Sequence, residues 1–95
     1  MPSSIDMGDM IVATSEQVSC DVEGDAAILN LKNGVYYGLN PMGARIWTLI
    51  QKPKQVRQLR DQLLSEYEVD ATRLEMDVRR LLTDLAEHGL IEVKA

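Results

Sequence analysis

The alternation of apolar and polar positions first outlines a β-hairpin. Two apolar runs, residues 26–31 and 35–39, flank an Asn-Gly pair in which Gly34 can adopt a positive φ at no steric cost. A two-residue loop would pair Leu31 with Tyr36, whereas a three-residue loop ending at Gly34 gathers the leucines on one face. We favour the three-residue loop because it gives a single apolar face. That face would hold Leu29, Leu31, Val35, Tyr37 and Leu39, with Ile28, Asn30, Tyr36 and Gly38 on the other.

A further strand is predicted before the hairpin. Val18, Cys20 and Val22 alternate with polar residues, which is the period of a half-buried strand, and a turn at residues 23–25 follows. The three strands would form an antiparallel meander. If the strand order follows the chain order, residues 35–39 form an edge strand that is open to further pairing.

Helical periodicity begins directly after the hairpin. Asn40 is suited to cap a helix whose first residue is Pro41, because proline lacks only a backbone donor that would be unpaired there. Trp47 is expected to anchor this first helix in the core, and the Lys52-Pro53 pair ends it. A second helix is predicted over residues 54–67.

The third helix has the clearest signals. Asp70 is its predicted N-cap, Gly89 its left-handed stop, and the helix runs from Ala71 to Glu87 or His88. Residues 90–93 would then either close the helix end or add a short strand. The apolar stripe of this helix is Leu74, Val78, Leu81, Leu82 and Leu85.

These elements predict an α+β fold of the winged helix-turn-helix-like type, a three-stranded antiparallel sheet followed by three helices. With 95 residues and 45% hydrophobic content, the chain fits one domain over residues 10–95, preceded by a flexible segment at residues 1–9. Residues 10–13 are a short apolar patch that we expect to lie against the domain. No membrane span or signal peptide is predicted, so a cytoplasmic location is expected.

Charge and composition argue against several functions. The net charge of -5 arises before Asn33, because from there on nine acids balance nine bases, so no basic face for nucleic acid is predicted. The single cysteine, Cys20, excludes an internal disulfide and is expected to be a buried, inert thiol. His88, the only histidine, fits a structural role at a helix end. We therefore expect no enzyme activity, no cofactor and no metal site.

Two features are candidates for contact with a ligand. Tyr36 and Tyr37 are adjacent on a strand and must point to opposite faces, so Tyr37 is expected in the core and Tyr36 outside it. On the third helix, polar side chains line one flank of the apolar stripe. They form either a solvated face with weak ion pairs or the rim of a groove that holds a peptide, and they are Asp77, Arg80, Asp84 and His88.

The order of these motifs resembles the PqqD-like family. Its pattern is an apolar strand, a glycine turn, a tyrosine-rich strand ending in Leu-Asn, a helix with an Ile-Trp pair, and a final helix ending in Gly-Leu-Ile, and it covers about residues 18–93. Lys54 departs from the small hydroxyl residue often found at that place. The matching residues are Leu31, Gly34, Tyr36, Leu39, Asn40, Ile46, Trp47, Tyr67, Val69, Asp70, Asp77, Val78, Leu85, Gly89 and Leu90.

The resemblance implies a recognition element for ribosomally synthesised peptide precursors. In such domains the precursor's leader peptide adds as a strand to the edge of the third strand and lies in a cleft against the third helix. By position, the implied contacts are Val35, Tyr36, Tyr37, Gly38 and Leu39 on the strand and Leu74, Asp77, Val78, Arg80, Leu81 and Asp84 on the helix.

The resemblance also implies partners. A small free-standing protein of this type resembles the leader-binding component of lasso-peptide biosynthesis, which serves a separate leader peptidase and a cyclase. A chaperone for a pyrroloquinoline quinone-type precursor and a winged-helix nucleic-acid binder are the alternatives. The predicted open edge would be compatible with a monomer or with an edge-paired dimer.

Overall fold

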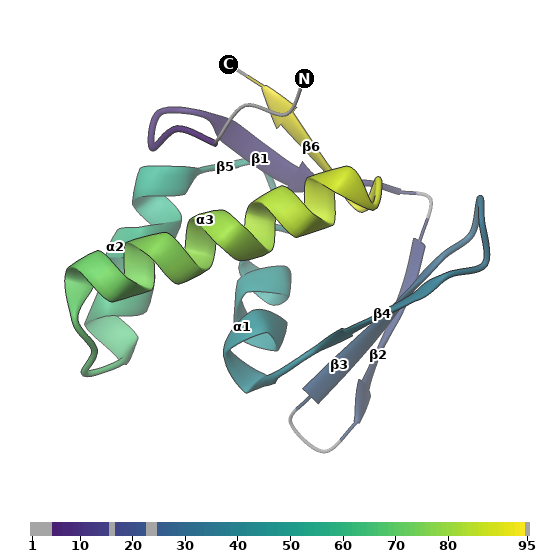
Figure 1. The fold of residues 1–95 in the computed structure, drawn as a ribbon, viewed down its shortest axis with the longest axis horizontal. Helices are drawn as coiled ribbons and strands as arrows, with labels where there is room; N and C mark the ends of the chain where they lie inside the picture. The colour runs from purple at the N-terminus through teal and green to yellow at the C-terminus, as the bar shows by residue number, and fades with distance from the viewer. Residues whose placement is uncertain (1–4, 16, 23–24, 95) are drawn as a thin grey trace.

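The structure is a computed structural model that describes residues 5–15, 17–22 and 25–94, with the backbone alone for residues 18 and 20–22. Within these residues it contains two three-stranded antiparallel sheets and three helices (Figure 1). One sheet has the order β2-β3-β4 and the other β5-β1-β6. The strands are β1 (Met10–Ala13), β2 (Gln17–Val22), β3 (Asp25–Asn30), β4 (Tyr36–Leu39), β5 (Lys54–Gln55) and β6 (Ile91–Lys94).

The predicted α+β, winged-helix-like architecture is confirmed, with the β2-β3-β4 meander followed by three helices. The helices are α1 (Pro41–Leu49), α2 (Val56–Glu66) and α3 (Ala71–Glu87). The Asn40 side chain accepts a hydrogen bond from the Gly43 N–H at 2.8 Å, and Asp70 accepts one from Arg73 at 2.9 Å, as the capping prediction requires. Gly89 has a φ of 70° and ends α3.

The sheet β5-β1-β6 was not predicted as a sheet from the sequence. The apolar patch at Met10–Ala13 forms β1, which pairs with both β5 and β6. Of the two alternatives for residues 90–93, the short strand is therefore the one found, at Ile91–Lys94. Because Lys54–Gln55 are in β5, α2 begins at Val56, two residues later than predicted. At the start of α2 the Gln55 N–H donates to Gln58 Oε1 at 3.2 Å, which is one half of a capping box.

The N-terminal segment is more firmly attached than expected. Ile5 is only 5% exposed and belongs to the core, and its carbonyl accepts a hydrogen bond from Arg79 Nε at 2.9 Å. The Met7 and Asp9 carbonyls accept bonds from the first backbone N–H groups of α2. The prediction of a flexible segment is therefore wrong for residues 5–9, because backbone pairing and one buried side chain fix it, and residues 1–4 lie outside the described part.

The hairpin register differs from both predicted alternatives. Ile28 pairs with Tyr37 and Leu29 with Tyr36, so the loop has four residues, 31–34. Gly34 does adopt the left-handed conformation, with a φ of 72°. The inward face therefore holds Ala26, Ile28, Asn30, Tyr37 and Leu39, whereas Leu29 shares the outer face with Tyr36 and Leu31 is exposed in the loop.

A buried amide explains this register. Asn30 is 6% exposed, and its Nδ2 donates to the His88 carbonyl at 2.8 Å while its Oδ1 accepts from the Lys32 N–H at 2.9 Å. A polar residue was assigned to the outer face, but its hydrogen-bonding partner at the end of α3 lets it point inward. Trp47 is buried as predicted, at 4% exposure. The Cys20 side chain lies outside the described residues, so its predicted burial is not tested.

Candidate functional site

β4 forms one edge of its sheet. In the order β2-β3-β4 it has β3 on one side and no strand of the described chain on the other, as the meander predicts (Figure 1). The Asn30 N–H donates to the Val35 carbonyl at 3.0 Å, so the main-chain groups of Val35 face β3. Because successive residues of an antiparallel strand alternate in direction, those of Tyr37 and Leu39 also face β3. The N–H and C=O groups of Tyr36 and Gly38 therefore face the open edge.

The side chains of Tyr36 and Tyr37 lie on opposite faces of β4, as predicted. Tyr36 is 70% exposed, whereas Tyr37 is half-buried on the inward face opposite Ile28. Val35, just before the strand, is 49% exposed, and Leu39 is buried. The edge thus combines free main-chain groups with exposed apolar side chains, which is the arrangement that another strand can extend.

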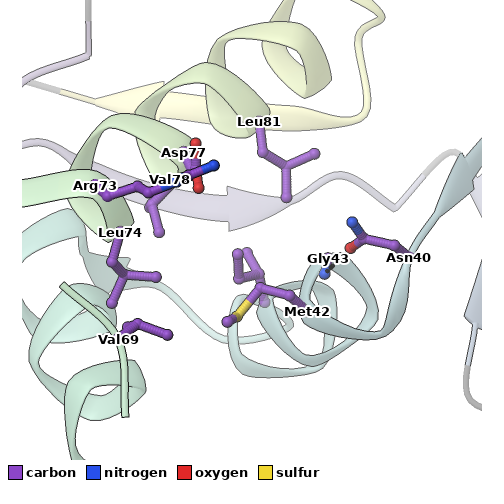
Figure 2. Close-up of a pocket in the computed structure, with 10 residues that line it drawn as sticks. Asn40, Met42, Gly43, Val69, Arg73, Leu74, Asp77, Val78 and Leu81 are labelled. Atoms are coloured by element: carbon purple, nitrogen blue, oxygen red, sulfur yellow. Dashed lines mark hydrogen bonds between the residues drawn. The ribbon is translucent and has the colours of Figure 1, made fainter. Parts of the chain in front are cut away.

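A groove begins where β4 ends. Its volume is about 460 Å³, and it lies between the N-terminal half of α1 and the N-terminal half of α3 (Figure 2). Figure 2 shows Met42 on α1 and Leu74 and Leu81 on α3 directed into this space. The lining residues are Asn40, Met42, Gly43, Ile46, Val69, Arg73, Leu74, Asp77, Val78 and Leu81.

The groove has an apolar floor and a charged rim. Ile46, Leu74 and Val78 are each less than 5% exposed, whereas Arg73 and Asp77 on α3 are exposed. Such a combination suits an apolar side chain inside the groove and polar contacts at its mouth.

Gly43 permits the close packing that places the groove beside the strand. A Cβ atom at this position would lie 3.2 Å from Leu39 Cδ2 and 3.3 Å from the capping oxygen of Asn40. A larger residue would therefore require the Leu39 or Asn40 side chain to shift by a few tenths of an ångström. Gly43 thus allows tight contact between the start of α1 and the end of β4.

A polar corner lies at the other end of the strand. The Tyr37 ring packs edge-on against His88, with the ring centroids 5.0 Å apart. His88 Nδ1 lies 2.7 Å from the Asp84 carbonyl oxygen, and since a carbonyl only accepts, Nδ1 carries the proton. Burial raises the pKa of Tyr37, and so do the charge of the nearby Asp84 carboxylate and a hydrogen bond to it. The structural role predicted for His88 at a helix end matches this geometry.

The structure brings most of the sequence-derived site residues together. Leu74, Asp77, Val78 and Leu81 line the groove, and residues 35–39 form or precede the open edge. Asp84 lies beside Tyr37, while Arg80 is exposed and outside the groove lining. Neither Asp77 nor Asp84 forms the expected ion pair with Arg80 within the described chain.

Sequence reasoning missed one wall of the groove. Met42 and Ile46 lie four positions apart on α1, but nothing in the local sequence indicates that they face α3. Arg73 carries one usable signal, since it lies four positions before Asp77 on the same helix flank. The other missed lining residues are Asn40, Gly43 and Val69.

Over the described residues, no group of three or more His, Cys, Asp or Glu side chains is placed to hold a metal ion. The same residues include no helix with the length and apolarity needed to cross a membrane.

Fold and site together define the class of the protein: a winged-helix-like α+β domain with an open strand edge that adjoins an apolar groove. The chain belongs to the PqqD family, since the family model described as coenzyme PQQ synthesis protein D matches residues 25–91. The family resemblance inferred from the motif order is thereby confirmed. No curated protein sequence matches the chain.

Two solved structures are similar to the chain over most of its length. TbiB1 in complex with the TbiA(beta) leader peptide is 33% identical, with a TM-score of 0.78 over 85% of this chain and 94% of that one. Lasso peptide synthetase B1 complexed with the leader peptide is 27% identical, with a TM-score of 0.74 over 86% of this chain and 96% of that one.

Proposed function

We propose that this protein is a non-catalytic adaptor that binds the leader peptide of a ribosomally synthesised precursor, specifically a lasso-peptide precursor. The observation that carries the proposal is the open edge of β4, where Tyr36 and Gly38 present main-chain groups beside an apolar groove. The similarity of this chain to two proteins solved with leader peptides supports leader-peptide binding.

Binding would occur by strand addition. Main-chain hydrogen bonds from Tyr36 and Gly38 would supply affinity independent of sequence, and pockets for alternate peptide side chains would supply specificity. The groove between α1 and α3 is the pocket nearest the end of β4. The proposed contacts are Val35, Tyr36, Tyr37, Gly38 and Leu39 on the edge and Leu74, Asp77, Val78, Arg80, Leu81 and Asp84 on α3, joined by Met42, Ile46 and Arg73 from the groove.

The adaptor would act by raising local concentration. A leader fixed on β4 leaves the rest of the precursor free for a separate leader peptidase and a cyclase, so each enzyme meets its substrate at a high effective concentration. No reaction is assigned to the chain itself, and we expect it to work in the cytoplasm as a monomer when the leader occupies the edge.

Two alternative functions are less well supported than binding of a lasso-peptide leader. A pyrroloquinoline quinone-type precursor would use the same edge, so it is a competing ligand rather than a different mechanism. Nucleic-acid binding is disfavoured because α3 has no excess of basic residues: it carries three arginines and four acidic residues. One of the arginines, Arg79, is also held by its bond to the Ile5 carbonyl.

The test is calorimetry with synthetic leader segments from short precursor genes that neighbour the gene for this chain, with a pyrroloquinoline quinone-type precursor as comparison. Tyr36→Pro removes the outward N–H, and we expect about tenfold weaker binding from the loss of one hydrogen bond. Tyr36→Ala is the matched control, because it removes the ring and keeps the N–H.

Equal losses for Tyr36→Ala and Tyr36→Pro would assign the effect to the ring, which both variants lack, and would contradict strand addition. Binding of no neighbouring leader would contradict the function. Tighter binding of the pyrroloquinoline quinone-type precursor would reassign the ligand within the same mechanism.

A further inference from the structure

Asp84 is a half-buried carboxylate with no cationic partner among the described residues. It forms no ion pair there, although Arg80 lies one helical turn away. A charge that is partly removed from water is unfavourable without an opposite charge nearby, so an anionic side chain beside a binding surface favours a ligand that carries a cation.

The position of Asp84 relates it to the open edge. It lies one turn along α3 from Leu81, which lines the groove, and on the same helix face. Its carboxylate neighbours Tyr37, an inward-facing residue of β4, and Tyr37 in turn contacts His88. The α3 surface beside β4 is therefore apolar near Leu39 and anionic near Tyr37.

The geometry of an added strand sets the spacing between the peptide side chains that reach these two zones. A strand added to β4 would place inward side chains beside Leu39 and beside Tyr37, and inward positions on one strand are two residues apart. The position beside Leu39 adjoins the groove, which begins at Asn40. The position beside Tyr37 adjoins Asp84.

We infer that Asp84 is a specificity residue that selects a lysine or arginine in the bound peptide, two positions from an apolar side chain that enters the groove. The inference rests on the proposed function and deepens it by naming a chemical feature of the ligand. Tyr37 and His88 act as positioning residues: the Asp84 carbonyl accepts the bond from His88 Nδ1, and the Tyr37 ring packs edge-on against His88.

The test uses a phage-displayed library of random peptides selected on the intact chain. Selected peptides that bind the Tyr36→Pro variant at least about tenfold more weakly than the unchanged chain are taken as edge binders. We expect Lys or Arg to be enriched two positions from an apolar residue in this set. Against Asp84→Asn the enriched peptides should bind about fivefold more weakly, as expected for loss of a partly exposed charge pair.

The matched control is Glu75→Gln, which makes the same change of charge on the opposite face of α3. It should leave the affinity of the enriched peptides unchanged, and circular dichroism checks that both variants fold. Edge binders with no basic preference, or an equal loss for Glu75→Gln, would overturn this inference and leave the proposed function standing. A selection that gives no edge binder would overturn the proposed function and the inference with it.

Discussion

Asn30 links the hairpin to the end of α3. Its side chain is buried and bonds to the His88 carbonyl on one side and to the Lys32 N–H on the other. Since both partners are main-chain groups, the amide sets where the hairpin lies relative to the helix. Together with the ring contact between Tyr37 and His88, this amide fixes the position of the β4 edge beside the end of α3.

Replacing that side chain should destabilise the whole domain. Asn30→Ala removes the donor of the partly buried bond to the His88 carbonyl, which we expect to cost about 2 kcal/mol and to lower the melting temperature by roughly 10 °C. Thermal unfolding followed by circular dichroism measures the change. The control is Asn33→Ala, which removes only an exposed local bond to the Val35 N–H. Equal losses for the two variants would show that the link to α3 adds nothing.

At the scale of elements, β1 organises the second sheet. It pairs on both sides, with β5 and with β6, and the side chain of Ile11 is fully buried between them and the helices. The neighbouring Met10 is 36% exposed on the opposite face. The N-terminal strand is therefore part of the core rather than an accessory to it.

This placement predicts a large difference between adjacent residues. Ile11→Ala should lower the free energy of unfolding by about 3 kcal/mol, because it leaves a cavity in the core. Met10→Ala, on the exposed face of the same strand, should change it by less than about 1 kcal/mol. Urea unfolding of both variants measures the values. Similar small losses would mean that β1 is not a core strand.

The elements that the sequence predicts well are those with local signals. The caps at Asn40 and Asp70 and the stop at Gly89 depend on neighbours within a few residues, and all three are confirmed. The second sheet was missed because β1 pairs with segments far along the chain. The hairpin register was wrong for a related reason, since the partner that allows Asn30 to point inward lies at His88.

At the scale of the whole molecule, the candidate site arises from two surfaces that meet. β4 contributes an open edge, and α1 and α3 contribute a groove at the end of that edge. The periodicity of α3 was sufficient to predict Leu74, Val78 and Leu81 on its buried stripe. The wall formed by Met42 and Ile46 could not be predicted, because it depends on how α1 packs against α3.

The most direct test of strand addition is amide hydrogen exchange with and without the bound leader. Strand addition predicts that exchange slows strongly at Tyr36 and Gly38, whose N–H groups face the open edge, and changes little at Tyr37 and Leu39, which face β3. A leader that binds while exchange at Tyr36 and Gly38 is unchanged would contradict strand addition.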